Sequence, residues 1–446
     1  MLDDVRFVEL LTIIISCLFL LIGVSRDRKI HSPYVVFNFL WIFVCIMLVI
    51  GDSHIYRPSV SALLVILVGV IGFNLSVMLP RFTVNGKRIF IKEGPRTFLM
   101  DRCRGLAVAL VFLWFFVSMD SILMLMSGSS LEGIRNNYYS DSSPVWIYYL
   151  KNYFLLPGTD AVIVASIISF IKQEKGSKPL LALAGILVLL RAVSSGGRYI
   201  LINTLIMVLC ALALFKTLAK LPWRKKASLY FVMALFAVLI IVFTNERTTA
   251  NTENFSLFEK LYFTVYSYFA GSVTYLSRLM FAFPQIEGAT FGTSFIGGLL
   301  TPIFSVLTFL NVMPYPEFMN VIGIYANMQL DIGPSTFYNA MPTVFGYFWI
   351  DGGLIAVFLE SLLLGYICNR TYRIAQSDNQ LFKAFYILLF VQICMVSTRW
   401  FFFTPDSLLS FAYLLFLFRV SDGDLLATAD GVHSAGDSAA YRNKIR

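Results

Sequence analysis

Long apolar segments separated by short polar ones fill most of this 446-residue chain. A helix of about 20 apolar residues crosses the ~30 Å hydrocarbon core of a bilayer. Segments that approach this length lie at residues 7–24, 34–50, 60–79, 106–126, 159–171, 180–195, 199–215, 227–244, 353–368, 384–403 and 407–419. We therefore predict an all-α polytopic membrane protein with about eleven transmembrane helices. The count ranges from about ten to thirteen because three segments are short.

One interval between the apolar segments is much longer than the others. Residues 245–352 contain 23 aromatic residues among 108, a composition that does not suit a solvated linker. The chain therefore divides into a first set of eight helices, a large loop, three more helices, and a polar tail that is expected to be disordered. These parts comprise residues 1–244, 245–352, 353–419 and 420–446.

Two stretches of the large loop, residues 258–283 and 291–312, are hydrophobic enough to form two further spans. We favour amphipathic or re-entrant helices in the outer leaflet, because several tyrosines and Arg278 spread polar groups through the first stretch. The second stretch is expected to be broken at Gly292, Gly297, Gly298 and Pro302.

Composition and charge give the orientation. Hydrophobic residues make up 58% of the chain and charged residues 14%, whereas about 25% of residues are charged in soluble proteins. With the loop after the first span placed in the cytoplasm, the cytoplasmic segments hold 25 of the 35 Lys and Arg residues. The positive-inside rule then predicts an outer amino terminus and a cytoplasmic carboxyl terminus. The net charge of +9 therefore reports topology rather than nucleic-acid binding.

The outer segments lack the residue types that metal, thiol or nucleotide chemistry would use. Five of the six cysteines lie in predicted spans and Cys103 lies in a cytoplasmic segment. His54 is the one histidine expected to face outward, so we expect no metal site there. The outer segments also contain no Gly-rich phosphate-binding loop. We therefore expect a reaction that uses no metal and no other cofactor.

The strongest candidate site lies in the tight turn between the sixth and seventh spans. Gly196 and Gly197 let the backbone turn sharply and approach a ligand closely, and Arg198 presents a planar, permanently charged group. Arg191 lies about 10 Å deeper by helical rise, where an unpaired cation costs about 3 kcal/mol or more. Two arginines at different depths indicate an anionic ligand such as a lipid pyrophosphate. The alternative is an interfacial arginine that extends to the headgroups.

Other charged residues are expected at the same outer level. Glu246 and Arg247 follow the eighth span directly, Arg278 lies in the aromatic stretch, and Arg399 lies near the outer end of the tenth span. Each alone fits a solvated helix end or an interfacial anchor. Together with the two arginines of the turn, they would form one anion site.

The end of the large loop supplies carboxylates and aromatic rings. Asp331 and Asp351 could bind sugar hydroxyls or accept a proton from one. Asp351 precedes two glycines, so it could instead cap the next helix. Candidate contacts to sugar rings, through stacking and hydrogen bonds, are Tyr338, Asn339, Tyr347 and Trp349.

These features resemble the oligosaccharide repeat-unit polymerases, the Wzy-type O-antigen polymerase family. The likeness covers most of the chain. It rests on a span that ends in an outward Gly-Gly-Arg turn, a large aromatic outer loop, and an Asp-Gly-Gly stretch before the next span. Arg198 matches the outward arginine of the family, and Asp351 matches its acidic residue before glycine. The arginine-to-glycine spacing that some members show in two outer loops is absent after Arg135, Arg247 and Arg278.

The resemblance implies a GT-C-like glycosyltransferase of the bacterial inner membrane, with a periplasmic amino terminus. It would join repeat units carried on undecaprenyl pyrophosphate at the periplasmic face, in contact with membrane lipids and with a chain-length regulator protein. Fixed arginines can neutralise a leaving pyrophosphate, and we assign this role to Arg191, Arg198 and Arg247, with Arg278 and Arg399 as further ligands. The base would be Asp331, Asp351 or Glu246.

Three other functions stay open. An O-antigen ligase would share the fold class, but proteins of that kind use a histidine in the large outer loop, and here that loop has none. A flippase for lipid-linked oligosaccharides is expected to show short loops and internal repeats. A purely structural membrane protein would not need arginines at membrane depth.

Overall fold

The computed structural model of the chain describes residues 2–79, 98–138, 144–216, isolated positions between 223 and 242, and residues 255–326, 328–334, 336–338, 342–377, 379–400 and 402–418. Most of the predicted eighth span and the whole predicted tail from residue 420 lie outside these ranges.

The first part of the bundle consists of α1 (Leu2–Asp27), α2 (Pro33–Ile50) and α3 (Val60–Leu75), which ends in the short 3₁₀ turn η1 (Ser76–Met78). Local signals set the starts of these helices. Pro33 occupies the first turn of α2, where a missing N–H costs nothing. Ser59 caps α3 by accepting a hydrogen bond from the Ala62 N–H.

The second part contains the bent pair α4 (Met100–Val117) and α5 (Met119–Met126), followed by α6 (Leu131–Tyr138) and α7 (Val145–Leu150). The π-helical turn η3 (Lys151–Leu155) continues α7 into α8 (Leu156–Ile171). Two antiparallel helices complete this part, α9 (Ser177–Ser195) and α10 (Tyr199–Leu214).

The carboxyl-terminal part begins with α13 (Leu257–Ala282), whose capping box joins Ser256 and Glu259. The 3₁₀ turn η5 (Pro284–Ile286), α14 (Thr293–Phe309) and α15 (Glu317–Ala326) follow. A small antiparallel hairpin of β1 (Leu330–Gly333) and β2 (Thr336–Tyr338) then leads to α16 (Val344–Ala375), α17 (Gln380–Met395) and α18 (Pro405–Leu417).

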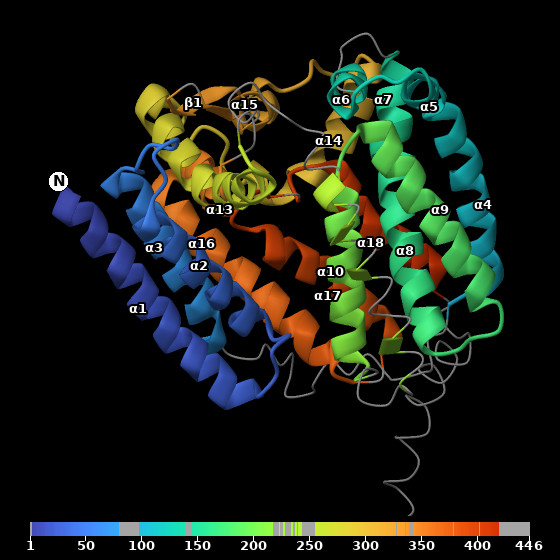
Figure 1. Cartoon of the computed structure of the whole chain (residues 1–446), viewed down its shortest axis with the longest axis horizontal. Coiled ribbons are helices and arrows are strands. Elements are labelled where there is room, and N and C mark those ends of the chain that lie inside the picture. Colours follow the sequence, from blue (N-terminus) through green and yellow to red (C-terminus); the bar gives the residue numbers. More distant parts are fainter. Residues whose placement is uncertain are drawn as a thin grey trace, which may run out of the picture.

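Two hydrophobic cores hold the bundle together. One is built by α1, α2, α3, α13 and α16 as far as Cys368, and the other by α4, α8, α9, α10 and α18. Both α16 and α17 contribute to the two cores and so join them. Figure 1 shows α6, α7, α15 and β1 at the same end of the bundle, which we call the hairpin end.

Within the described residues, five helices are long and apolar enough to cross a membrane, and a sixth is gained if the α4–α5 pair, bent by 56°, counts as one span. The shorter apolar helices include α3, α10, α17 and α18. The structure is therefore that of a helical, multi-pass membrane protein, as the sequence predicts. The count of eleven spans stays a prediction.

Two helix boundaries differ from the prediction. The expected break at Gly297, Gly298 and Pro302 is wrong, because α14 runs continuously through all three. The glycines serve packing instead: a Cβ on Gly298 would lie 2.6 Å from the backbone oxygens of Phe402 and Thr404. The helix expected from residue 353 is preceded by a further helical stretch: α16 begins at Val344, in the part assigned to the end of the large loop, and departs from helical geometry at Gly352 and Gly353 before it continues.

Candidate functional site

The turn between α9 and α10 is built by a left-handed glycine. Gly196 has φ of 54° and closes α9, with its N–H donating to the Val193 carbonyl at 3.2 Å. This conformation is open to glycine at little cost. Gly197 does not have positive φ, so only one of the two predicted turn glycines needs its missing side chain for the backbone. Arg198 is the residue directly before α10.

Arg191 forms a buried ion pair. Its Nη1 donates to Asp160 Oδ1 at 2.6 Å, with the two side chains 11% and 15% exposed. Asp160 belongs to α8, beside Thr159, which accepts a hydrogen bond from the Trp114 indole at 2.9 Å. A charge-assisted bond of this length is among the stronger polar contacts in proteins, and it supplies the partner that a cation at this depth requires.

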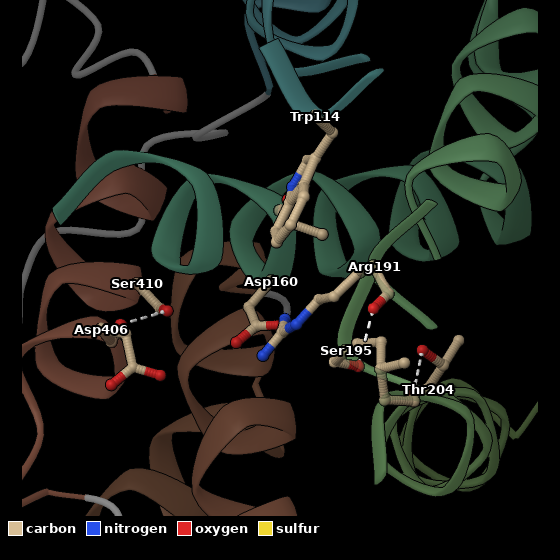
Figure 2. Close-up of polar contacts among 9 residues, drawn as sticks. Trp114, Asp160, Arg191, Ser195, Thr204, Asp406 and Ser410 are labelled. Atoms are coloured by element: carbon tan, nitrogen blue, oxygen red, sulfur yellow. Dashed lines mark hydrogen bonds and ion pairs between the residues drawn. The ribbon is translucent and has the colours of Figure 1, made fainter. Parts of the chain in front are cut away.

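Further charged and phenolic groups surround the pair. Tyr199 at the start of α10 lies within electrostatic range of Arg191, Asp160 and Arg399. Asp406, in the first turn of α18, lies within range of Asp160. Figure 2 shows the Asp160 carboxylate between the Arg191 guanidinium and the Asp406 carboxylate. Four helices or their ends thus converge on one small volume.

Arg198 is held by an aromatic ring. Its guanidinium carbon lies 5.1 Å from the ring centroid of Tyr268 on α13, within the range of a cation–π contact. The residue is only 8% exposed. The face of this guanidinium is therefore covered by protein, which favours contacts made in its plane, such as a bidentate bond to an oxyanion.

Arg191 and Arg399 lie within electrostatic range of Tyr199, and Arg198 is the neighbour of Tyr199 along the chain, so we call Arg191, Arg198 and Arg399 the arginine cluster. Its three cations and the two nearby carboxylates, Asp160 and Asp406, carry a formal net charge of +1. Partial burial places these charges where the effective dielectric is low, so electrostatic attraction to an anion is stronger than in water. The arrangement can hold a phosphate or carboxylate group and can stabilise negative charge that develops on a leaving group.

The structure does not bring two other predicted residues to this cluster. Arg278 donates from Nε to the Asp331 carbonyl at 3.0 Å, and its Nη2 lies 3.9 Å from Asp331 Oδ2. The guanidinium stacks over Tyr56 at 4.8 Å. Arg278 lies ten residues beyond Tyr268 on α13, or about 15 Å by helical rise. It forms a separate pair with Asp331 at the hairpin end.

Asp351 has a structural partner that the sequence did not reveal. Its carboxylate accepts the Ser294 backbone N–H at 2.9 Å and also the hydroxyls of Thr290 and Ser294. Asp351 therefore caps the start of α14. The alternative prediction, that it caps the helix that follows Gly352 and Gly353, is wrong. The same Ser294 hydroxyl lies 3.1 Å from Glu360 Oε2, so the buried Asp351 carboxylate and the half-buried Glu360 carboxylate meet there.

A break in α16 makes this capping possible. Gly352 and Gly353 leave helical geometry, and Gly353 has φ of 60°. This positive φ is a conformation that favours glycine, so a side chain at position 353 would strain the backbone. The backbone carbonyls released near the break are used: those of Trp349 and Asp351 accept the N–H groups of Gly288 and Phe291.

The remaining predicted residues lie elsewhere or outside the described ranges. Tyr347 and Trp349 are each 2% exposed and belong to the first core. Their predicted role as stacking platforms is therefore wrong for this conformation, because no sugar ring can reach them. Tyr338 pairs through its backbone with Leu330 in the hairpin. Glu246, Arg247 and Asn339 lie outside the described residues.

Sequence reasoning missed Asp160 and Asp406. Each had a signal that could have found it. Asp160 is an acidic residue inside a predicted span, where ionisable groups usually mark a site. Asp406 stands directly before the last apolar segment, at the expected membrane boundary.

Among the described residues, no three His, Cys, Asp or Glu side chains are grouped so that they could hold a metal ion. Comparison with known proteins identifies no relative: no protein-family model, no curated protein and no solved structure matches this chain.

Proposed function

We propose that the protein is a glycosyltransferase that polymerises oligosaccharide repeat units carried on undecaprenyl pyrophosphate, at the periplasmic face of a bacterial inner membrane. The proposal includes a GT-C-like fold with about eleven spans, the hairpin end in the periplasm, and the carboxyl terminus in the cytoplasm. It draws on the sequence resemblance to the Wzy-type polymerases described above.

The observation that carries the proposal is the buried arginine cluster at the end of α9 and the start of α10. Arg198 is 8% exposed and Arg191 is 9% exposed. Arg191 already has a counter-ion in Asp160, and the arginine cluster with its two nearby carboxylates still carries a formal net charge of +1, which attracts an anion in a partly buried site. A lipid pyrophosphate brings two negatively charged phosphates to the level of the headgroups, which matches the charge and the expected depth of the cluster.

In the proposed mechanism, the acceptor sugar hydroxyl attacks the anomeric carbon of the donor, and the bond from that carbon to the pyrophosphate oxygen breaks. Arg198 and Arg399 stabilise the negative charge that develops on the departing undecaprenyl pyrophosphate. Asp160 holds Arg191 in position. Asp406, which lies within electrostatic range of Asp160, accepts the hydroxyl proton. No metal or nucleotide takes part.

A direct test uses the purified full-length chain with an undecaprenyl-pyrophosphate-linked repeat unit and EDTA. We expect a ladder of products that differ by one whole repeat unit, together with released undecaprenyl pyrophosphate, both measured by mass spectrometry. A ligase would transfer the glycan only when a second lipid acceptor is supplied. A flippase would leave the mass of the substrate unchanged, and unreacted single units with a folded protein would reject the polymerase proposal.

A further inference from the structure

A second cationic site lies at the end of the bundle opposite the hairpin end. The last turn of α1, the turn η1 and the final third of α16 enclose a cavity of about 210 Å³. Arg26, Arg370 and Arg373 line it, together with the apolar residues Val77 and Leu79. Three guanidinium groups beside apolar side chains are suited to an amphipathic ligand that has an anionic group and an apolar part.

The cavity wall on α16 follows from helical spacing. Tyr366, Asn369, Arg370 and Arg373 also line the cavity, and their positions i, i+3, i+4 and i+7 place them on one face of a helix. Arg373 donates from Nε to Asn369 Oδ1 at 3.2 Å. This contact fixes the plane of the guanidinium while using only one of its five N–H donors.

The charge of the cavity is not balanced locally. Within the described part of the chain, no carboxylate forms an ion pair with any of these three arginines. The adjacent Asp27 instead accepts a hydrogen bond from the Ser32 hydroxyl at 2.7 Å. Cations near the carboxyl ends of α1 and α16 gain from the helix dipoles. That effect explains single arginines but gives no reason for three of them to share a cavity.

We propose that this cavity binds a phosphate group, in the form of an anionic phospholipid headgroup or of free phosphate. Arginine forks match phosphate oxygens, and basic pockets between transmembrane helices on the cytoplasmic side are suited to anionic headgroups. Val77 and Leu79 would contact the start of the acyl chains if the ligand is a lipid. The site is separate from the arginine cluster and does not depend on the polymerase proposal.

The test measures lipid binding to the full chain in neutral detergent by native mass spectrometry. Phosphatidylglycerol is the probe and phosphatidylcholine is the zwitterionic control. The test variant is R370Q/R373Q. The matched control is K175Q/K178Q, which removes the same charge from exposed lysines around the start of α9, on the opposite side of the bundle in Figure 1. Each variant is compared with its own lipid-free thermal stability.

We expect the wild type to prefer phosphatidylglycerol. The arginine variant should bind it about thirtyfold more weakly, since each cation near the surface contributes about fivefold, and the lysine variant should retain the preference. If instead inorganic phosphate raises the melting temperature of the wild type but not of the arginine variant, with no lipid preference, the site holds free phosphate. Equal binding of both lipids to the wild type, with no effect of phosphate, would overturn the proposal even if the arginine variant does not fold.

Discussion

Two arginine–aspartate pairs in this chain are alike in composition and opposite in environment. The Arg191–Asp160 pair joins α8 and α9 at 2.6 Å with both side chains largely buried. The Arg278–Asp331 pair spans 3.9 Å, with the side chains 40% and 41% exposed. Solvent screens the second pair and competes for its hydrogen bonds, whereas the first pair exchanges solvation for one short contact. We therefore expect the buried Arg191–Asp160 pair to contribute more to stability and ligand binding than the exposed Arg278–Asp331 pair.

The largest expected effect comes from removing the buried acid. D160A leaves the Arg191 guanidinium without its counter-ion, which should lower the free energy of unfolding by about 3–5 kcal/mol. The R191A/D160A double variant should recover part of this loss because no charge is then stranded. Unfolding in detergent, followed by tryptophan fluorescence, measures both. A double variant less stable than D160A would show that the ion pair is not the cause.

The next effect concerns activity at Arg198. Loss of one transition-state contact costs about 3 kcal/mol, or about a hundredfold in rate, and lysine cannot reproduce a bidentate fork. R198K and R198A should both lose long polymer while the protein still accumulates in the membrane. R278A is the matched comparison, because Arg278 also stacks on a tyrosine, and its loss should be far smaller. Equal losses for the two arginines would remove the functional distinction between the arginine cluster and Arg278.

Asp351 adds a buried carboxylate that has no arginine partner among the contacts described. D351N keeps the size of the side chain but replaces one acceptor oxygen with a donor, so the Ser294 N–H or hydroxyl loses its acceptor. A buried group left unsatisfied costs about 1–3 kcal/mol. We expect a loss of stability in this range, seen in the same unfolding assay. An unchanged midpoint would mean that water replaces the cap.

The smallest effect should come from the exposed pair. D331N, which removes the charge but keeps an oxygen to accept the Gly333 N–H, should change the free energy of unfolding by about 0–1 kcal/mol, and raising the salt concentration should abolish the difference from the wild type. Thermal unfolding at low and high salt provides the measurement. A loss as large as that of D160A would place the second pair in a much less polar environment than its exposure indicates.

Several features of the fold follow directly from the sequence. The apolar segments predict where helices lie, and the Gly-Gly-Arg turn between α9 and α10 forms as expected, because both depend on neighbouring residues along the chain. The pairing of Arg191 with Asp160 joins residues 31 apart, and apolar periodicity carries no information on such partners. The burial of Tyr347 and Trp349 could not be predicted either, because it depends on the packing of α16 against α3, which is distant in sequence.

The cap on α14 has a consequence for the order in which the chain is assembled. Asp351 lies 57 residues after Ser294, so the ribosome completes α14 well before its acceptor is made. Until then the first turn of α14 lacks the side-chain acceptor that Asp351 provides for its N–H groups. The final packing of α14 therefore depends on the synthesis of α16, and a chain that is truncated before Asp351 would lack the cap on α14.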